Sequence, residues 1–305
     1  MMRRLFFGMT FLLLTAAFPL RAQFGGREGD VVLYLLTSKG EMTFQTVPAG
    51  TSNSSANLSR FEVVDPATKP DIPLGEGFPE EFTRQILHEE SDDLFQLVTQ
   101  REGLPGPHRQ FLTTYKTFII KGVVRETETG DDYVAASGTT LKQGADFGPD
   151  LALDTLQVLF WATTSTFPLV VPTPLGQTGP SVPPGMTGDE YIKSLGFVPL
   201  FIPWENMRRL DPEGKWPEGV DRKIMDQDDS VGSTIGEVRV RPGKTTPLFR
   251  IPASTHVFVL QGEVRLSVPG AGEFTMPQNH YAFLPPGLSF SLSNPKAYDG
   301  PLPGE

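Results

Sequence analysis

Histidine and acidic residues are the first candidates for chemistry, because the 305-residue chain contains four His and no Cys. The lack of Cys excludes disulfides, thiolate metal sites and Cys nucleophiles. His88 opens the segment HEESD, which lacks the second His of a zincin motif. The acidic runs at 89–93 and 226–229 lack the glycine-punctuated ligand loop of a calcium site. We therefore expect both acidic runs to be solvated turns.

The local sequence around the histidines gives little support for a metal centre. His88 precedes an acidic run, which predicts a solvated turn, and His280 lies in an exposed turn. His108 follows a Pro, which predicts a position on a rim. A divalent transition metal needs three or four N, O or S ligands. Such a site would have to combine His88 and His108 with an acid such as Glu102 or Asp146, and this remains the alternative.

An internal repeat must position these residues. Arg241–Val264 aligns without a gap on Arg101–Val124, at a constant offset of 140 (241 − 101). Both copies keep two glycines, and their central apolar runs coincide. A second match, Arg84–Leu87 with Arg222–Met225, has an offset of 138 (222 − 84), and an acidic run follows each copy. Two copies of one fold should agree, so we interpret both regions as strand, acidic turn and strand.

The strand candidates are short, regularly spaced and rich in β-branched and aromatic residues. This spacing favours an all-β sandwich or barrel over an α/β fold. The candidates in the first half are 95–99, 114–124, 133–136 and 156–162, and those in the second half are 234–240, 256–267, 274–276, 281–284 and 289–293.

These elements divide the chain into two predicted barrels. The first covers residues 24–165 and includes an N-terminal hairpin made by the runs 31–36 and 42–47. Six prolines within 166–185 predict an extended linker, which continues to residue 196 and includes a short helix at 191–195. The second barrel covers residues 197–294, and residues 295–305 form a loose tail.

The first 22 residues are typical of an export signal. Arg3 and Arg4 precede the apolar run 5–18, and cleavage is expected after Ala22. The two arginines leave Sec and twin-arginine export open. Cleavage would remove three of the 26 basic residues and none of the 36 acidic ones, so the net charge would change from −10 to 23 − 36 = −13. An exported protein this acidic is expected to bind neither nucleic acid nor, once cleaved, a membrane.

The repeat unit resembles the cupin superfamily of β jelly-roll barrels. The resemblance covers residues 82–162 and 197–294 and implies two tandem barrels, a bicupin. Gly243 and Gly262 frame the family's first motif in the second copy, and Pro285-Pro286-Gly287 with Asn294 matches the second motif. The residues at its metal-ligand positions are not ligands: Phe249, Ile251, Thr255 and, in motif two, Phe290. Phe and aliphatic residues fill a barrel interior instead.

The first copy is also degenerate. Tyr115 occupies the position of the family's Glu. The two His positions hold His108 and Gln110 with the longer motif spacing, or Arg109 and Phe111 with the shorter one. Motif two is poorly matched. The resemblance therefore implies no cofactor and no metal in either barrel.

Three functional classes are compatible with these residues. The first is a metal-free protein that holds an apolar small molecule in a barrel lined by Tyr115, Phe249 and Phe290, or that has a structural role. The second is an enzyme, such as an isomerase, lyase or dioxygenase, with His108 as base or ligand and Tyr115 as acid. The third is an assembly module that forms a homodimer, which the resemblance also implies. Metal analysis of the mature protein and of His108→Ala separates the first class from the second.

Overall fold

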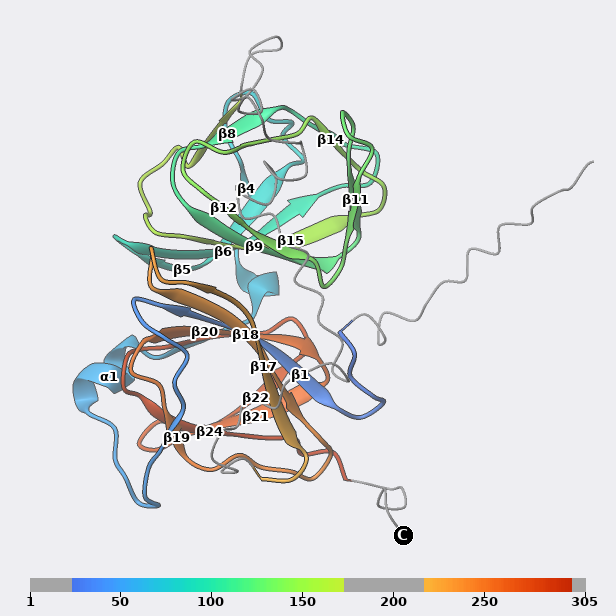
Figure 1. Cartoon of the computed structure of the whole chain (residues 1–305). Coiled ribbons are helices and arrows are strands. Elements are labelled where there is room, and N and C mark those ends of the chain that lie inside the picture. The colour runs from blue at the N-terminus through green and yellow to red at the C-terminus, as the bar shows by residue number, and fades with distance from the viewer. Residues whose placement is uncertain (1–23, 173–216, 298–305) are drawn as a thin grey trace, which may run out of the picture.

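The computed structural model describes residues 24–172 and 217–297, which form two stacked β-barrels (Figure 1). We call the upper barrel in Figure 1 barrel 1 and the lower one barrel 2. In the described part, the regular elements are strands apart from helix α1 (Ser55–Arg60) and a 3-10 turn at Pro66–Thr68. Ser54 caps α1 by accepting a hydrogen bond from the Asn57 amide. This all-β architecture confirms the predicted fold class.

Barrel 1 consists of a six-stranded sheet, ordered β12-β9-β15-β6-β5-β4, and two smaller sheets, β11-β10-β14-β7 and β13-β8-β16. Its strands are β4 (Ile72–Pro73), β5 (Thr83–Glu90), β6 (Asp93–Gln100), β7 (Pro105–Gly106), β8 (Arg109–Phe111), β9 (Tyr115–Lys121), β10 (Val123–Glu126), β11 (Asp132–Val134), β12 (Gly138–Leu141), β13 (Asp146–Phe147), β14 (Asp150–Ala152), β15 (Leu156–Ala162) and β16 (Val170–Pro172).

Barrel 2 consists of a six-stranded sheet, ordered β17-β18-β1-β20-β23-β3, and a five-stranded sheet, β2-β19-β24-β21-β22. Its strands are β1 (Val31–Ser38), β2 (Gln45–Thr46), β3 (Glu62–Val64), β17 (Val220–Asp228), β18 (Ser233–Val240), β19 (Phe249–Arg250), β20 (Ser254–Gln261), β21 (Glu263–Val268), β22 (Gly272–Pro277), β23 (Tyr281–Leu284) and β24 (Ser289–Ser293).

The N-terminal segment lies in barrel 2, so the predicted N-terminal hairpin in the first barrel is wrong. Strand β1 lies between β18 and β20, where Leu33 pairs with both Val238 and Val259, and β2 pairs with β19. All eight residues of β1 are buried. Leu33 and Leu35 face the interior of barrel 2, and Tyr34 faces barrel 1. A strand that is apolar on both faces suits a central position in a covered sheet.

Strand β15 is the counterpart of β1 in barrel 1. It lies between β6 and β9, and its register with β9 shifts between Gln157 and Val158. The register of β1 with β20 shifts between Val32 and Leu33, at the matching point of the strand. The first segment of the chain therefore completes barrel 2, whereas β15 belongs to the continuous stretch of chain that builds barrel 1. Strand β16, which pairs with β8, also lies within the segment predicted as linker.

The predicted strand, acidic turn and strand is confirmed in both copies. Strands β5 and β6 form one hairpin, and β17 and β18 form the other. The register of the first shifts between Ile86 and His88, and that of the second between Ile224 and Asp226, which are equivalent positions in the alignment of the two copies. Such a matched bulge shows that the two copies share the backbone detail as well as the strand order.

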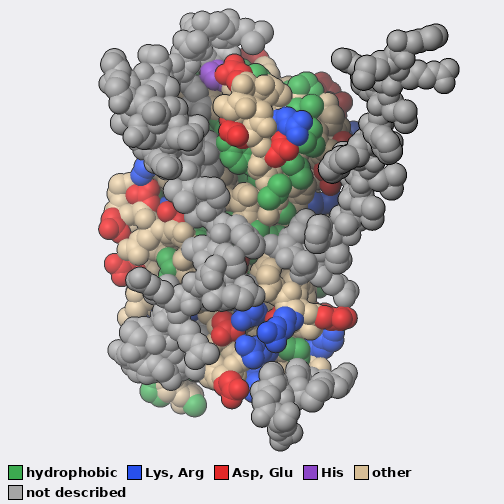
Figure 2. Space-filling view, turned by 45° about the vertical axis from the view of Figure 1, so that its right-hand side comes forward, with side chains coloured by type: hydrophobic (Ala, Val, Ile, Leu, Met, Phe, Trp, Pro, Cys, Tyr) green, Lys and Arg blue, Asp and Glu red, His purple; other side chains and the backbone are tan. Residues whose placement is uncertain are grey.

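The two six-stranded sheets pack against each other through a buried apolar layer between the barrels. This layer includes Leu97 and Phe118 from barrel 1 and Tyr34, Phe258 and Phe283 from barrel 2. Tyr34 and Phe118 lie in ring contact across it, with centroids 4.9 Å apart. Figure 2 shows a group of basic side chains on the lower barrel, although the whole chain is acidic.

Several predictions fall outside the described residues. The signal segment 1–22, the helix 191–195, most of the linker and the start of the second barrel before residue 217 are among them. In the described part, no helix is long and apolar enough to cross a membrane.

Candidate functional site

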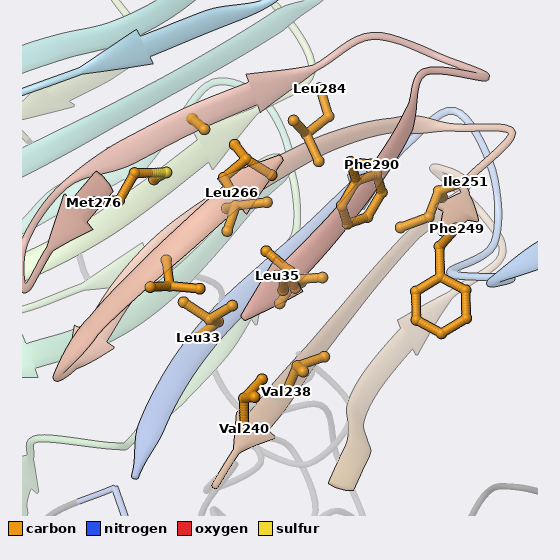
Figure 3. Close-up of a cluster of buried hydrophobic side chains, with 14 of the residues drawn as sticks. Leu33, Leu35, Val238, Val240, Phe249, Ile251, Leu266, Met276, Leu284 and Phe290 are labelled. Atoms are coloured by element: carbon orange, nitrogen blue, oxygen red, sulfur yellow. The ribbon is translucent and has the colours of Figure 1, made fainter. Parts of the chain in front are cut away.

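The interior of barrel 2 is a continuous apolar core. Phe249, Ile251 and Phe290, which occupy ligand positions of the motif, are 2%, 2% and 0% exposed and belong to this core. Figure 3 shows their side chains among Leu35, Leu284 and their neighbours. Phe249 pairs with Phe290 across β19 and β24. The apolar side chains thus fill the space that a metal and its ligands would need.

The donor set of barrel 2 does not fit a metal of the kind that intact cupin motifs hold. Phe249, Ile251 and Phe290 have no lone pair to donate. Thr255 is buried, and its hydroxyl donates to the Ala253 carbonyl at 3.1 Å. Across the described residues 24–172 and 217–297, no group of three or more His, Cys, Asp or Glu side chains could hold a metal ion.

In barrel 1 the sequence candidates divide between two faces of the wall. Tyr115 is fully buried in an interior cluster with Phe111. On β8, Arg109 and Phe111 are buried, whereas Gln110 alternates to the other side and donates to the Gly144 carbonyl at 3.4 Å. His108 is half-buried before this strand. The shorter motif spacing therefore describes the interior, and His108 and Gln110 do not converge with Tyr115.

Arg109, which is buried on β8, belongs to a buried polar cluster with Asp150 and Gln100. Arg109 Nη2 donates to Asp150 Oδ2 at 2.5 Å, and Gln100 Nε2 donates to Asp150 Oδ1 at 2.9 Å. The Arg109 guanidinium lies 4.8 Å from the ring centroid of Phe147. The two charges neutralise each other, so this cluster anchors β14 to β8. Asp150 was not among the sequence candidates. The shorter motif spacing places Arg109 at an interior position, and a buried Arg could have indicated a buried acidic partner.

Tyr115 and Gln96 place unpaired polar atoms in the interior of barrel 1. The Tyr115 ring makes edge contacts with Phe111 and Phe160, with centroids 5.1 and 6.0 Å apart. Burial raises the pKa of Tyr115 far above its usual value, against a smaller lowering by Arg84. The Tyr115 hydroxyl and Gln96 Oε1 are buried without a hydrogen-bond partner. Such atoms are costly unless something pairs with them.

His88 corrects a second prediction, because it is buried between the barrels rather than solvated. It is 7% exposed, and its ring stacks on Phe283 with centroids 3.7 Å apart. Burial, followed by the charge of His256, lowers the pKa of His88 to about 4. Glu62 and Glu90 lie 3.8 and 3.9 Å from its ring nitrogens but do not offset this effect. His280, predicted to be exposed, is half-buried in the turn before β23.

Next to His88, an Asp–His–Tyr relay links the two barrels. His256 Nε2 lies 2.8 Å from Asp93 Oδ1, and His256 Nδ1 lies 2.7 Å from the Tyr281 hydroxyl. Ser38 donates to Asp93 Oδ2 at 2.6 Å, and Trp161 Nε1 donates to Oδ1 at 2.8 Å. With its proton on Nε2, His256 donates to Asp93 and accepts from Tyr281, so every group is satisfied.

The electrostatics of the relay favour a fixed structural role. Burial alone would raise the pKa of Asp93, but His256, Ser38 and Trp161 hold it well below the usual value. Burial and then Asp93 raise the pKa of Tyr281. The side chains of Asp93 and His256 are 0% exposed, so the relay has the hydrogen bonding of a catalytic triad without access for a substrate.

The relay has a pseudo-equivalent on the other half of the interface. In the alignment of the two copies, Lys116 matches His256 and His88 matches Asp226. Lys116 Nζ donates to Asp226 and, at 2.9 Å, to Thr140 Oγ1. Side chains alternate along β20, so His256 lies on the opposite face of the strand from Thr255. Asp93 was missed, because its partner lies 163 residues away in the other barrel.

Solved structures share the arrangement of two barrels. A "putative dioxygenase" from Nostoc punctiforme superposes with a TM-score of 0.54 and 15% identity, covering 77% of this chain and 79% of that protein. Oxalate decarboxylase from Bacillus subtilis superposes with a TM-score of 0.50 and 15% identity, covering 81% and 75%. No family model and no curated protein matches the sequence. The likeness concerns the fold: this chain has two tandem cupin barrels in a bicupin arrangement.

Proposed function

We propose that this chain is an exported, metal-free bicupin whose first barrel holds a small apolar molecule with one polar group. Barrel 2 serves as its structural support. The observation that carries the proposal is the pair of buried, unpaired polar atoms, Tyr115 Oη and Gln96 Oε1, in the interior of barrel 1, where Tyr115 belongs to a buried apolar cluster. A molecule with a hydroxyl group would satisfy one of these atoms and bury its apolar part against Phe111 and Phe160.

The cross-strand register supports an interior position for both groups. In barrel 1, Gln96 and Thr117 flank Phe160 across neighbouring strands. At the mouth, the Arg84 guanidinium lies 3.9 Å from the ring centroid of Phe167. Charge and hydrogen-bonding capacity therefore remain in barrel 1 after the metal-ligand positions have lost their function. The large buried layer between the barrels supports the structural role of barrel 2, and a homodimer would add a further surface.

Export and the absence of a metal are part of the same proposal. The basic and apolar start of the chain with a cleavage point after Ala22 supports export. The donor sets in both barrels support a protein that does not need the metal of the cupin motifs. The enzyme hypothesis centred on His108 gains no support from the geometry, since His108 is half-buried in the segment before β8, whereas Tyr115 lies in the interior cluster.

The experiment is a calorimetric titration of the mature protein with p-cresol and with toluene. We expect both to bind, and we expect p-cresol to bind more tightly because its hydroxyl pairs in the interior. Tyr115→Phe should remove most of the preference for p-cresol and leave toluene binding unchanged. Thr255→Val is the matched control, because Thr255 occupies the position of barrel 2 that is equivalent to Tyr115 in the alignment of the two copies.

Failure of both compounds to bind, or equal effects of the two substitutions, would overturn the ligand site. Metal analysis of the same samples tests the second part. We expect far less than one metal ion per chain, and stoichiometric metal that disappears in His108→Ala would instead support the enzyme hypothesis.

A further inference from the structure

A pocket of about 630 Å³ lies at one end of barrel 2, where the chain enters β1 and leaves β24. We call it the terminal pocket. Its volume falls within the range of small-molecule sites. It lies outside the barrel 1 interior used above, so it stands apart from the proposed function. Its polar lining comes from four segments of the chain and includes Asp30, Gln261, Glu263, Gln278, Asn294 and Lys296.

The walls of the terminal pocket are fixed by hydrogen bonds. Gln261 Nε2 donates to the Arg27 carbonyl at 2.9 Å and to the Asp30 carbonyl at 3.2 Å. Asn294 Nδ2 donates to the Gly29 carbonyl at 2.8 Å, and its Oδ1 accepts from the Lys296 amide at 3.0 Å. These bonds join the start of β1 to the ends of β20 and β24, so the pocket is preformed.

A glycine allows the wall to close. Gly262 has φ of +80°, and a Cβ atom there would lie 2.8 Å from the Asp30 carbonyl oxygen. The same turn in barrel 1 holds Gly122, but the residue after it is Val123, whereas Glu263 follows Gly262. The pocket therefore combines a backbone feature of both barrels with the carboxylate of Glu263, which has an apolar residue as its counterpart in barrel 1.

Two polar groups in the terminal pocket have no partner among the residues that the structure describes. Gln261 is 7% exposed, and its Oε1 is buried without a hydrogen-bond partner. Lys296 is exposed and, among the residues that the structure describes, no ion pair to its ammonium group is found. Asp30 and Glu263 add two carboxylates to the lining. The pocket thus offers acceptors for a positively charged donor and one ammonium group for a negatively charged acceptor.

We propose that the terminal pocket binds a small zwitterion, an amino acid or short peptide with free amino and carboxylate ends. Its ammonium group binds the acceptors of Gln261, Asp30 and Glu263, and its carboxylate binds Lys296. Charge-assisted hydrogen bonds are stronger than those between neutral groups, so each end contributes separately to affinity. Lys296 and Glu263 come from different segments of the chain, so the site selects ligands by the distance between their two charged groups.

The test is a calorimetric titration of the mature protein with L-alanyl-L-alanine. We expect one site per chain, with affinity at least about tenfold lower for the N-acetylated peptide, for the peptide amide and for the Lys296→Met variant. Glu263→Gln should weaken the free peptide but not the acetylated one. Lys69→Met, which changes a lysine outside the pocket lining, is the control and should leave binding unchanged.

The proposal would be overturned by no heat of binding at millimolar peptide, by equal binding of the free and the blocked peptides, or by equal affinity in Lys296→Met and in the parent protein. Binding of glucose in place of the peptide would also overturn it, because a neutral polyol needs neither charge. Since p-cresol binding depends on Tyr115, failure here leaves the proposed function of barrel 1 standing, and the reverse also holds.

Discussion

The two barrels share a backbone but differ in their interiors. At matching positions, barrel 1 has Gln96, Phe160 and Thr117, whereas barrel 2 has Gly236, Leu35 and Val257. In barrel 2 the Met42 sulfur lies 3.0 Å from the place where a Cβ of Gly236 would be, so it fills the space of a longer side chain.

This difference shows how a duplicated fold can separate two tasks. The interior of barrel 2 is a packed apolar core, which suits a structural support. Barrel 1 keeps polar atoms in its interior and bears the energetic cost of leaving them unpaired. Under the proposed function, a bound ligand would offset this cost by pairing with one of these atoms.

The first prediction concerns the interface, where His256 and Lys116 are pseudo-equivalent. His256→Ala should destabilise the protein by about 4 kcal/mol, because it leaves the Asp93 carboxylate buried without its main partner. Lys116→Met should cost about 1 kcal/mol or less, because an apolar side chain of similar length replaces the lysine and Asp226 keeps contact with water. Asp226 is 27% exposed, whereas Asp93 is 0% exposed. Chemical denaturation of both variants measures the difference, and equal losses would contradict the assigned asymmetry.

The second prediction tests the packed interior of barrel 2. Phe290→Ala should destabilise the protein by about 3–5 kcal/mol, because a fully buried ring in a continuous core leaves a cavity. Thermal and urea unfolding give the value. Phe167→Ala in barrel 1 is the comparison. Phe167 is 36% exposed, so its loss should cost far less. A loss below about 1 kcal/mol for Phe290→Ala would mean that barrel 2 is not packed as described.

Much of the fold could be predicted from the repeat, because a strand and its bulge leave a matching pattern in both copies. The location of β1 could not be predicted. Its run of apolar residues indicates a strand buried on both faces, but periodicity does not say which sheet receives it. The same limit applies to the relay, since Asp93 and His256 meet only because the two sheets stack.

The candidate site could be predicted in part. The motif spacing identified Phe249, Ile251 and Phe290 as side chains that fill a barrel, and the structure places them in a core. Two spacings were open for barrel 1, and only the backbone shows that Arg109 and Phe111 face inward. Gln96 was missed because it lies outside both motifs.

The third prediction is acid destabilisation through His88. Its pKa in the folded protein is about 4, below the usual 6.5. A folded pKa below the unfolded one means that stability is complete above pH 6.5 and falls as the pH decreases toward 4. The shift corresponds to about 3 kcal/mol at most. Denaturation midpoints between pH 7 and 4 should show this decline, and His88→Phe should reduce it. An unchanged decline in that variant would assign the effect to other groups.

The smallest expected effect is at Tyr115. Tyr115→Phe should change the free energy of unfolding by about 1 kcal/mol or less and in the stabilising direction, because it removes an unpaired hydroxyl from the interior. A clear destabilisation measured in urea would show that the hydroxyl has a partner in the free protein. Together, Phe290→Ala and Tyr115→Phe compare the two barrel interiors through the same quantity, the change in the free energy of unfolding.

The most direct test of the account is an anomalous difference map from crystals soaked in 4-iodophenol. We predict one iodine peak inside barrel 1, with the phenol oxygen within hydrogen-bonding distance of Tyr115 Oη or Gln96 Oε1, and none inside barrel 2. A peak inside barrel 2, or an empty barrel 1 at saturating ligand, would contradict the division of tasks between the barrels.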